Sequence, residues 1–161
     1  MTNESQYQID IFQTVRKKFL SDEQIRNIVC FVLKEQKVKS AYIDIAVVGD
    51  KYMKKMTAKY SGKQYCTDVL SFDLGAEGKV ELMAQVIVNA QLACRVAKKN
   101  AASVSAELAM YVIHGLLHLL GFDDKTPEDA QKMHAETFEL LKKLKFKRLP
   151  PMPSHFAHVA S

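Results

Sequence analysis

The sequence has little of what a secreted or membrane-embedded protein needs. It contains three cysteines, Cys30, Cys66 and Cys94, and this odd number without C-x-x-C spacing argues against a disulfide framework and fits free thiols in a reducing compartment. The opening residues MTNESQYQIDIF show no basic segment followed by an apolar one, and no apolar run is long enough to cross a membrane. We therefore expect a cytoplasmic protein without a membrane partner.

Proline is scarce and unevenly placed. Three of the four prolines lie in the last segment, LPPMPSHFAHVAS, which has neither helical nor strand periodicity. The chain has 161 residues, of which 48% are hydrophobic and 25% charged, and no internal repeat divides it, so one core is expected. We predict a single domain over residues 1–148 and a poorly ordered tail over 149–161, with His155 and His158 in that flexible segment rather than in a metal site.

Hydrophobic periodicity predicts strands and helices in alternation early in the chain and helices later. Strands are expected at 7–12, 41–48, 67–72 and 80–88. Helices are expected at 21–36, 51–60, 89–99, 102–120 and 127–145. This order predicts an α+β fold with α/β layering, in which about five helices cover a small mixed sheet of four strands.

Polar residues mark several of the predicted helix starts. Ser21 is followed three residues later by a glutamine, the pattern of a capping box, and Thr126 stands before a proline at the start of the last helix. Asp50 is placed to cap the helix at 51–60, whose Tyr52 and Met53 are expected to face inward.

Two histidines stand in the most apolar part of the chain. Residues 108–120 are too few for a membrane span and too many for a strand, so they predict a buried helix that places His114 and His118 on one face, one turn apart. A buried imidazole without a partner costs a few kcal/mol, and a divalent metal satisfies both rings at once. A purely structural histidine pair is the alternative.

The residues after this helix include a candidate for the third metal ligand, and Gly115 within the helix argues against a peptidase. Gly121 suits a helix end that turns the chain back, and Asp124 then stands ten residues after the first histidine, where metzincin-type sites place their third ligand. Capping of the next helix is the alternative role for Asp124. Gly115 occupies the position of the general-base glutamate of H-E-x-x-H proteases, so a peptidase is not expected.

The net charge of +5 and pI near 9.0 are mildly basic. Lysine and arginine gather at 16–18, 54–63, 98–99 and 142–148. If folding brings even two of these clusters together they would attract a polyanion such as RNA, whereas each cluster alone is typical of a solvated helix face.

The segment HGLLHLLGFDD, with TDVLSF upstream and the Glu107-Leu108 pair before the first histidine, resembles the YbeY family of bacterial metal-dependent endoribonucleases. The likeness covers nearly the whole chain up to about Leu141. It implies a zincin-like metal site on the long buried helix, beside the sheet edge, and one divalent metal per chain, most simply zinc. It also implies work on single-stranded ribosomal RNA in ribosomal RNA maturation and ribosome quality control, with a ribosomal protein as a possible further partner and no DNA.

Two departures from the family pattern fall at the expected site. The family's third ligand is usually a histidine, and Asp124 stands there; a carboxylate still binds zinc, but its negative charge makes bound water less acidic and the metal a weaker Lewis acid. Before TDVLSF, Ser61 replaces an arginine that would clamp a phosphate, and serine cannot make that bidentate contact. Lys59 or Lys63 is expected to supply the missing charge beside Ser61.

The predicted function is metal-dependent hydrolysis of phosphodiesters in single-stranded RNA, with the metal on His114, His118 and Asp124. Asp123 is expected to accept the N–H of a metal-bound histidine, and no residue is assigned as general base. The alternative is a non-catalytic ribosome-assembly or RNA-binding factor with a structural metal. The third ligand stays open between Asp124 and His134, although polar neighbours place His134 at the surface.

Overall fold

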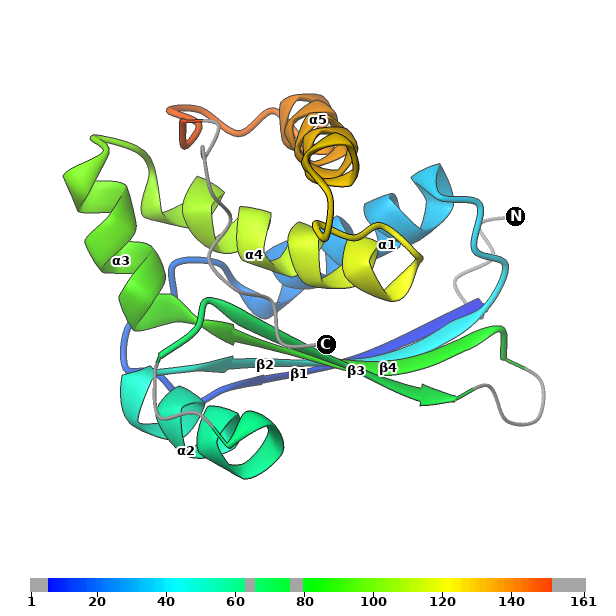
Figure 1. Ribbon diagram of the computed structural model, residues 1–161, viewed down its shortest axis with the longest axis horizontal. Coiled ribbons are helices and arrows are strands. Elements are labelled where there is room, and N and C mark those ends of the chain that lie inside the picture. Colours follow the sequence, from blue (N-terminus) through cyan, green and yellow to red (C-terminus); the bar gives the residue numbers. More distant parts are fainter. Residues whose placement is uncertain (1–5, 63–65, 76–79, 152–161) are drawn as a thin grey trace.

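The computed structural model describes residues 6–62, 66–75 and 80–151. Its four strands form one sheet in the order β1-β2-β4-β3 (Figure 1). The strands are β1 (Tyr7–Gln13), β2 (Ala41–Val48), β3 (Val69–Gly75) and β4 (Leu82–Asn89). β1, β2 and β4 are parallel and β3 runs antiparallel to β4, which confirms the predicted mixed sheet.

Five helices cover this sheet unequally. They are α1 (Asp22–Glu35), α2 (Asp50–Ser61), α3 (Ala90–Lys99), α4 (Val104–Leu119) and α5 (Pro127–Lys143). α1 and α4 lie on one face, α5 packs on the outer side of α4, and α2 alone lies on the opposite face (Figure 1). The predicted α+β layering is therefore confirmed.

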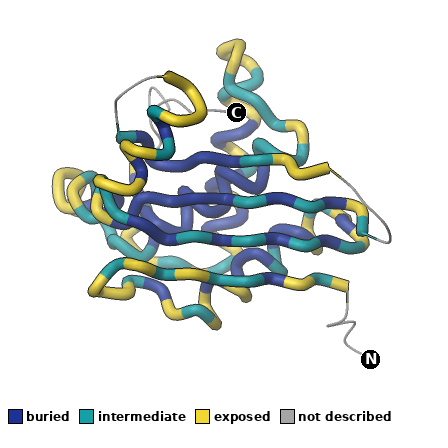
Figure 2. The backbone as a smooth tube through the Cα atoms, turned by 90° about the horizontal axis from the view of Figure 1, so that it is seen from below, coloured by how far each residue is buried: buried dark blue, intermediate teal, exposed yellow. Residues whose placement is uncertain are grey.

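α4 is the central helix of the protein. Every residue from Ala106 to Leu117 is buried, because α4 contacts β3 and β4 on one side and α1, α3 and α5 on the others. A helix that is apolar all round needs such complete enclosure. Figure 2, seen from below, shows buried positions along the inner strands, whereas exposed positions gather at the connections between elements and along the outermost strand near the N-terminus.

The helix starts confirm two of the three predicted caps. Ser21 and Gln24 form a reciprocal capping box, and the Thr126 hydroxyl accepts a hydrogen bond from the Asp129 N–H at 3.1 Å. The prediction for Asp50 was wrong, because Gly49 is the N-cap of α2 and Asp50 is its first residue.

The inward orientation predicted for Tyr52 was also wrong, whereas that of Met53 is confirmed. Tyr52 is 47% exposed because α2 buries only one narrow stripe, Met53 and Thr57, against the far face of the sheet. β3 begins two residues later than predicted: the Asp68 carbonyl accepts the Asn89 N–H at 2.9 Å, before the ladder with β4 starts.

The predicted tail falls mostly outside the described residues, as do His155 and His158. Among the residues that the structure describes, no helix is both long and apolar enough to cross a membrane.

Candidate metal centre

One stripe of α4 carries the polar side chains that are buried in this helix. Glu107, Tyr111, His114 and His118 follow one another at intervals of four, three and four residues, which helical geometry places on one face. His114 is 1% exposed in the middle of the core, and His118 is half-buried one turn later, near the end of the helix. The predicted alignment of the two histidines is thus present.

The environment of His114 keeps its ring neutral. Burial, together with the smaller effect of the nearby His118 and His134 rings, lowers the pKa of His114 to about 3. A neutral imidazole retains the lone pair that a metal ion needs, so this histidine would not have to release a proton before binding.

The strongest indication that an ion binds here comes from His118. Its Nδ1 atom is fully buried, and no hydrogen-bond partner for it is found among the described residues. Buried polar atoms in folded proteins are satisfied in the great majority of cases, and an exception calls for a partner such as a bound water or ion. Imidazole nitrogen is a donor that zinc binds readily.

Two aspartates lie in the turn between α4 and α5. Gly121 adopts a φ of 101°, the left-handed conformation expected at this bend. Asp123 Oδ1 accepts the Lys125 N–H at 3.1 Å and so shapes the turn; a contact between Asp123 and a histidine stays a prediction. Asp124 is half-buried and lies near enough to His134 for its charge to raise the pKa of that ring.

His134 was predicted at the surface, and this prediction was wrong. The side chain is 6% exposed and its Nε2 atom is fully buried. It belongs to the inner stripe of α5 with Met133, Thr137 and Leu141, which packs against α4, while its polar neighbours point outward. Burial lowers the pKa of His134, although Asp124 opposes this shift. A third imidazole therefore approaches the His114–His118 stripe from another helix.

The side chains do not converge into a finished coordination sphere. Within residues 6–62, 66–75 and 80–151, no three His, Cys, Asp or Glu side chains lie close enough together to hold a metal ion. The ligand set His114, His118 and Asp124 therefore stays a prediction, and closing it needs side-chain rotations.

Gly115 shows why the helix has no glutamate beside the first histidine. A Cβ at this position would lie 2.7 Å from Val86 Cγ1 and 2.9 Å from both Ser71 Oγ and Val69 Cγ2. The Ser71 hydroxyl donates to the Gly115 carbonyl at 2.9 Å, which holds β3 against α4 at this close approach. There is no room for any side chain here, so the general base of H-E-x-x-H proteases has no structural equivalent at this position.

Residues 6–145 match the family model described as Endoribonuclease YbeY. This chain belongs to the YbeY family.

Curated YbeY relatives from several bacteria agree with this assignment. "Endoribonuclease YbeY" of Malacoplasma penetrans is 30% identical over 84% of this chain and 93% of its own length, and that of Cellvibrio japonicus is 31% identical over 87% and 81%. The relative from Anaeromyxobacter is 41% identical over 62% of this chain, but this match spans only 53% of the relative. The solution structure of TM1509 from Thermotoga maritima shares the fold, with a TM-score of 0.62 at 21% identity over 84% of this chain and 88% of that one.

The two departures from the YbeY family pattern fall in different parts of the fold. Asp124 lies on the α4–α5 turn, whereas Ser61 ends α2 on the opposite face of the sheet (Figure 1). The Ser61 hydroxyl donates to the Thr57 carbonyl at 2.7 Å, and Lys59 Nζ lies 5.2 Å from the centroid of the Tyr60 ring. Lys63 lies outside the described residues. Phosphate contacts by Ser61, Lys59 and Lys63 stay predictions.

The sequence analysis did not predict two buried acidic residues, Asp68 and Glu107, of which Glu107 lies on α4. Asp68 is 5% exposed, and burial raises its pKa to about 7 although Val69 N–H and the Thr67 hydroxyl donate to its Oδ1 atom. Glu107, 2% exposed, has its pKa raised by burial and interacts with Asp68 and Tyr111. Two features of the sequence could have indicated these buried acids: an aspartate directly before an apolar strand and a glutamate within an apolar helix.

Proposed function

We propose that this chain is a metal-dependent endoribonuclease that cuts single-stranded RNA during ribosomal RNA maturation in the cytoplasm. Membership of the YbeY family, whose curated relatives are named endoribonucleases, supports the reaction class. The net charge of +5 supports a polyanionic substrate. The observation that best supports metal binding is the buried Nδ1 atom of His118, which lies on the same helix face as the neutral His114.

In this proposal His114 and His118 hold one zinc-like ion, with Asp124 as the third ligand. A bound zinc ion would polarise a phosphoryl oxygen and lower the pKa of a bound water. α4 contributes rigidity, because its complete burial keeps the two imidazoles in register. Close packing at Gly115 leaves no space for a side chain at position 115, so the residue after His114 does not supply a general base. The Asp124 carboxylate would reduce the charge of the centre, so we expect slower cleavage than at an all-histidine site.

The ligand set is tested by metal content per chain, measured after zinc loading and gel filtration. We expect near-stoichiometric zinc in the wild type and in Glu128→Ala, an exposed charge-matched control on the first turn of α5. His118→Gln and Asp124→Ala should lose most of the metal. If Asp124→Ala keeps zinc while His134→Asn loses it, the third ligand is His134, and the role of Asp124 is disproved.

The reaction is tested with end-labelled single-stranded RNA. We expect cleavage that disappears with chelator and in His118→Gln, and that returns to the wild type when zinc is restored. Circular dichroism checks that the His118→Gln variant is folded like the wild type. Cleavage insensitive to both chelator and His118→Gln would contradict the proposal.

A second candidate function is an RNA-binding ribosome-assembly factor whose metal is structural. Serine at the position of the phosphate-clamping arginine favours it. This function predicts RNA binding without metal-dependent cleavage, together with a lower unfolding temperature after metal removal.

A further inference from the structure

A cavity of ≈ 700 Å³ opens at the edge of the sheet where the parallel strands end. Its lining comes from three connections: residues 14–19 after β1, 49–55 at the start of α2, and 90–94 at the start of α3. This volume lies within the range of roughly 300–1,000 Å³ that small-molecule and cofactor sites occupy. The lining contains none of the histidines of the candidate metal centre.

The sheet topology accounts for the cavity. The chain leaves β1 toward α1 on one face of the sheet, and leaves the neighbouring strand β2 toward α2 on the other face (Figure 1). Where adjacent parallel strands send their connections to opposite faces, a crevice opens beyond their carboxyl ends, and open α/β sheets bind ligands at this point.

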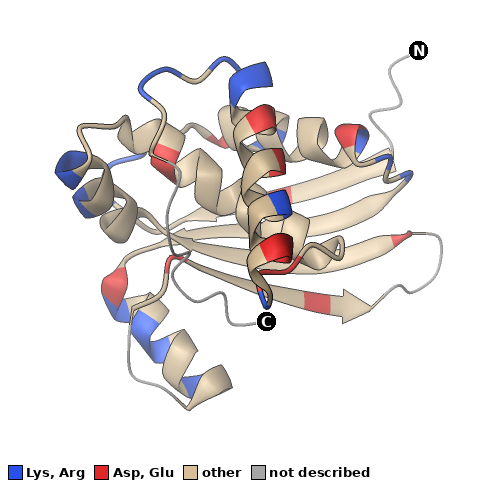
Figure 3. Ribbon diagram, turned by 45° about the horizontal axis from the view of Figure 1, so that its top comes forward, with Lys and Arg blue, Asp and Glu red and all other residues tan. Residues whose placement is uncertain are grey.

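The charge of the cavity is positive. Arg16, Lys17, Lys51 and Lys55 are among its lining residues, and no Asp or Glu is found among the described residues that line it. Figure 3 shows lysines repeated along α2. The N-terminus of α2 also faces this region; its N-cap, Gly49, has no side chain, although Gln91 Oε1 already accepts the Asp50 N–H there.

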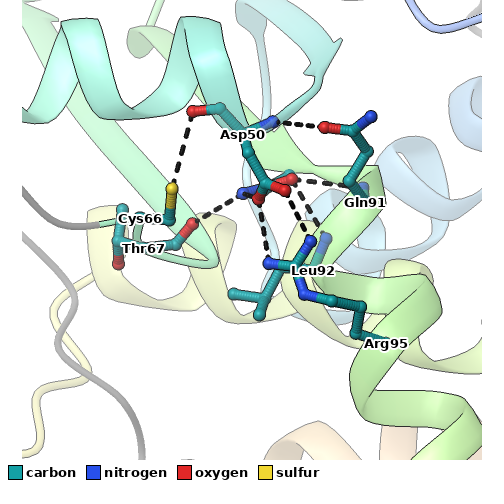
Figure 4. Close-up of polar contacts among 7 residues, drawn as sticks. Asp50, Cys66, Thr67, Gln91, Leu92 and Arg95 are labelled. Carbon is teal, nitrogen blue, oxygen red and sulfur yellow. Dashed lines mark hydrogen bonds and ion pairs between the residues drawn. The ribbon is translucent and has the colours of Figure 1, made fainter.

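Hydrogen bonds hold the two helix starts together. The Asp50 N–H donates to Gln91 Oε1 at 2.7 Å, and Asp50 Oδ1 accepts from Asn89 Nδ2 at 2.9 Å and Arg95 Nη2 at 3.0 Å (Figure 4). A Cβ at Gly49 would lie 2.7 Å from Gln91 Oε1, so a larger residue there would require the Gln91 side chain to shift. The Asp50 charge is matched by Arg95, and the cavity wall is preorganised.

The cavity also has an apolar and aromatic part. Val15, half-buried Phe19 and Tyr52 contribute to the lining, and Tyr52 is 47% exposed although it lies in the first turn of α2. Lys17 Nζ lies 5.2 Å from the centroid of the Phe19 ring, which places a cation beside this aromatic wall. An exposed aromatic ring next to cations suits a planar base that carries a phosphate.

We propose that this cavity binds a nucleoside phosphate. Lys51, Lys55 and the N-terminus of α2 receive the phosphate, and the base packs against the side of the cavity that Tyr52 and Phe19 form. The ligand is either a free nucleotide or one nucleotide of an RNA strand, because both present the same base and phosphate. The proposal does not rest on ribonuclease activity or on the metal.

Calorimetric titration of the full chain with AMP, in buffer with chelator, tests the phosphate contacts. We expect Lys51→Gln/Lys55→Gln to bind AMP about tenfold more weakly or worse, since hydrogen bonds to charged groups are strong. Lys98→Gln/Lys99→Gln is the control: it removes the same charge from exposed positions of α3 outside the lining, and its affinity should match the wild type. Absence of AMP binding at millimolar concentration, or equal loss in both double variants, would overturn the site.

Inorganic phosphate and Tyr52→Ala test the base. We expect AMP to bind the wild type at least about fivefold more tightly than phosphate, because base stacking on an aromatic ring strengthens binding, and Tyr52→Ala should remove most of this difference. If the wild type binds AMP and phosphate with equal affinity, the cavity is only an anion site, and the proposed contact with the base is disproved.

Competition with a single-stranded RNA trinucleotide identifies the source of the nucleotide. If the trinucleotide displaces bound AMP at a lower concentration than unlabelled AMP does, the site belongs to an RNA strand. If it displaces AMP only at a higher concentration, the site belongs to a free nucleotide; both outcomes support the proposal.

Cys94, half-buried in the lining, gives a second readout. AMP should slow its alkylation in the wild type but not in Lys51→Gln/Lys55→Gln, and unchanged alkylation at saturating AMP would place the ligand elsewhere.

Discussion

Gly115 shows how one missing side chain defines what the central helix can do. In most helices a Gly→Ala change gains about 1 kcal/mol from helix propensity. Here the added methyl would meet Val86 Cγ1 at 2.7 Å and two further atoms of β3 at 2.9 Å. Branched side chains on buried strands cannot move away without cost, so the clash outweighs the propensity.

We predict that Gly115→Ala lowers the free energy of unfolding by about 1–3 kcal/mol, the usual cost of overpacking a core. Urea denaturation measures the change. In the Val69→Ala background the penalty should be smaller, because one of the three close contacts is gone. A stabilised Gly115→Ala variant would mean that α4 can move away from the sheet.

Asp68 is expected to make stability depend on pH. Burial raises its pKa from 3.8 to about 7, so the folded state favours the protonated form. Its contribution to stability is therefore complete below the unfolded pKa and is lost as the pH rises through about 7.

We predict that Asp68→Asn gains stability relative to the wild type between pH 5 and pH 8, by an amount on the order of a few kcal/mol. Asparagine keeps the Oδ1 acceptor for the Val69 N–H but does not ionise. Asp73→Asn, at an exposed position of the same strand, should leave the wild-type pH profile unchanged. Parallel profiles for the wild type and Asp68→Asn would contradict the raised pKa.

At the level of elements, α5 decides whether the site has a third imidazole. His134 shares its inner stripe with Met133, Thr137 and Leu141, and this stripe faces α4. Polar neighbours suggested a surface position from the sequence, but the helical period already set His134 one residue from Met133 and three from Thr137. The periodicity was a better guide than the neighbours, because adjacent residues in a helix point about 100° apart.

The start of α5 gives a prediction about this helix. Thr126→Ala removes the side chain that accepts the Asp129 N–H, and we expect a loss of about 1 kcal/mol in the free energy of unfolding. Thr126→Ser keeps the hydroxyl and should lose far less. If both variants are equally unstable, the methyl group and not the cap is responsible.

At the scale of the whole molecule, the proposed metal links α4 to the turn that leads into α5. A ligand that binds only the folded state raises its stability in proportion to the logarithm of its concentration. We predict that a hundredfold excess of zinc over its dissociation constant stabilises the wild type by about 2.7 kcal/mol and His118→Gln by much less. Thermal unfolding with added zinc and with chelator measures both. Equal zinc effects in the two proteins would place the metal elsewhere.

The sequence by itself determined the order of strands and helices, the burial of α4 and the alignment of His114 with His118. These features follow from periods of two and about 3.6 residues and from residues such as Ser21, Thr126 and Gly121, all of which act within a few positions of the chain. Tertiary structure alone decided that His134 approaches His114, that Asp68 and Glu107 are buried together, and that three strand ends enclose a basic cavity. Those contacts join residues twenty or more positions apart, and only packing of the sheet against its helices brings them within reach of one another.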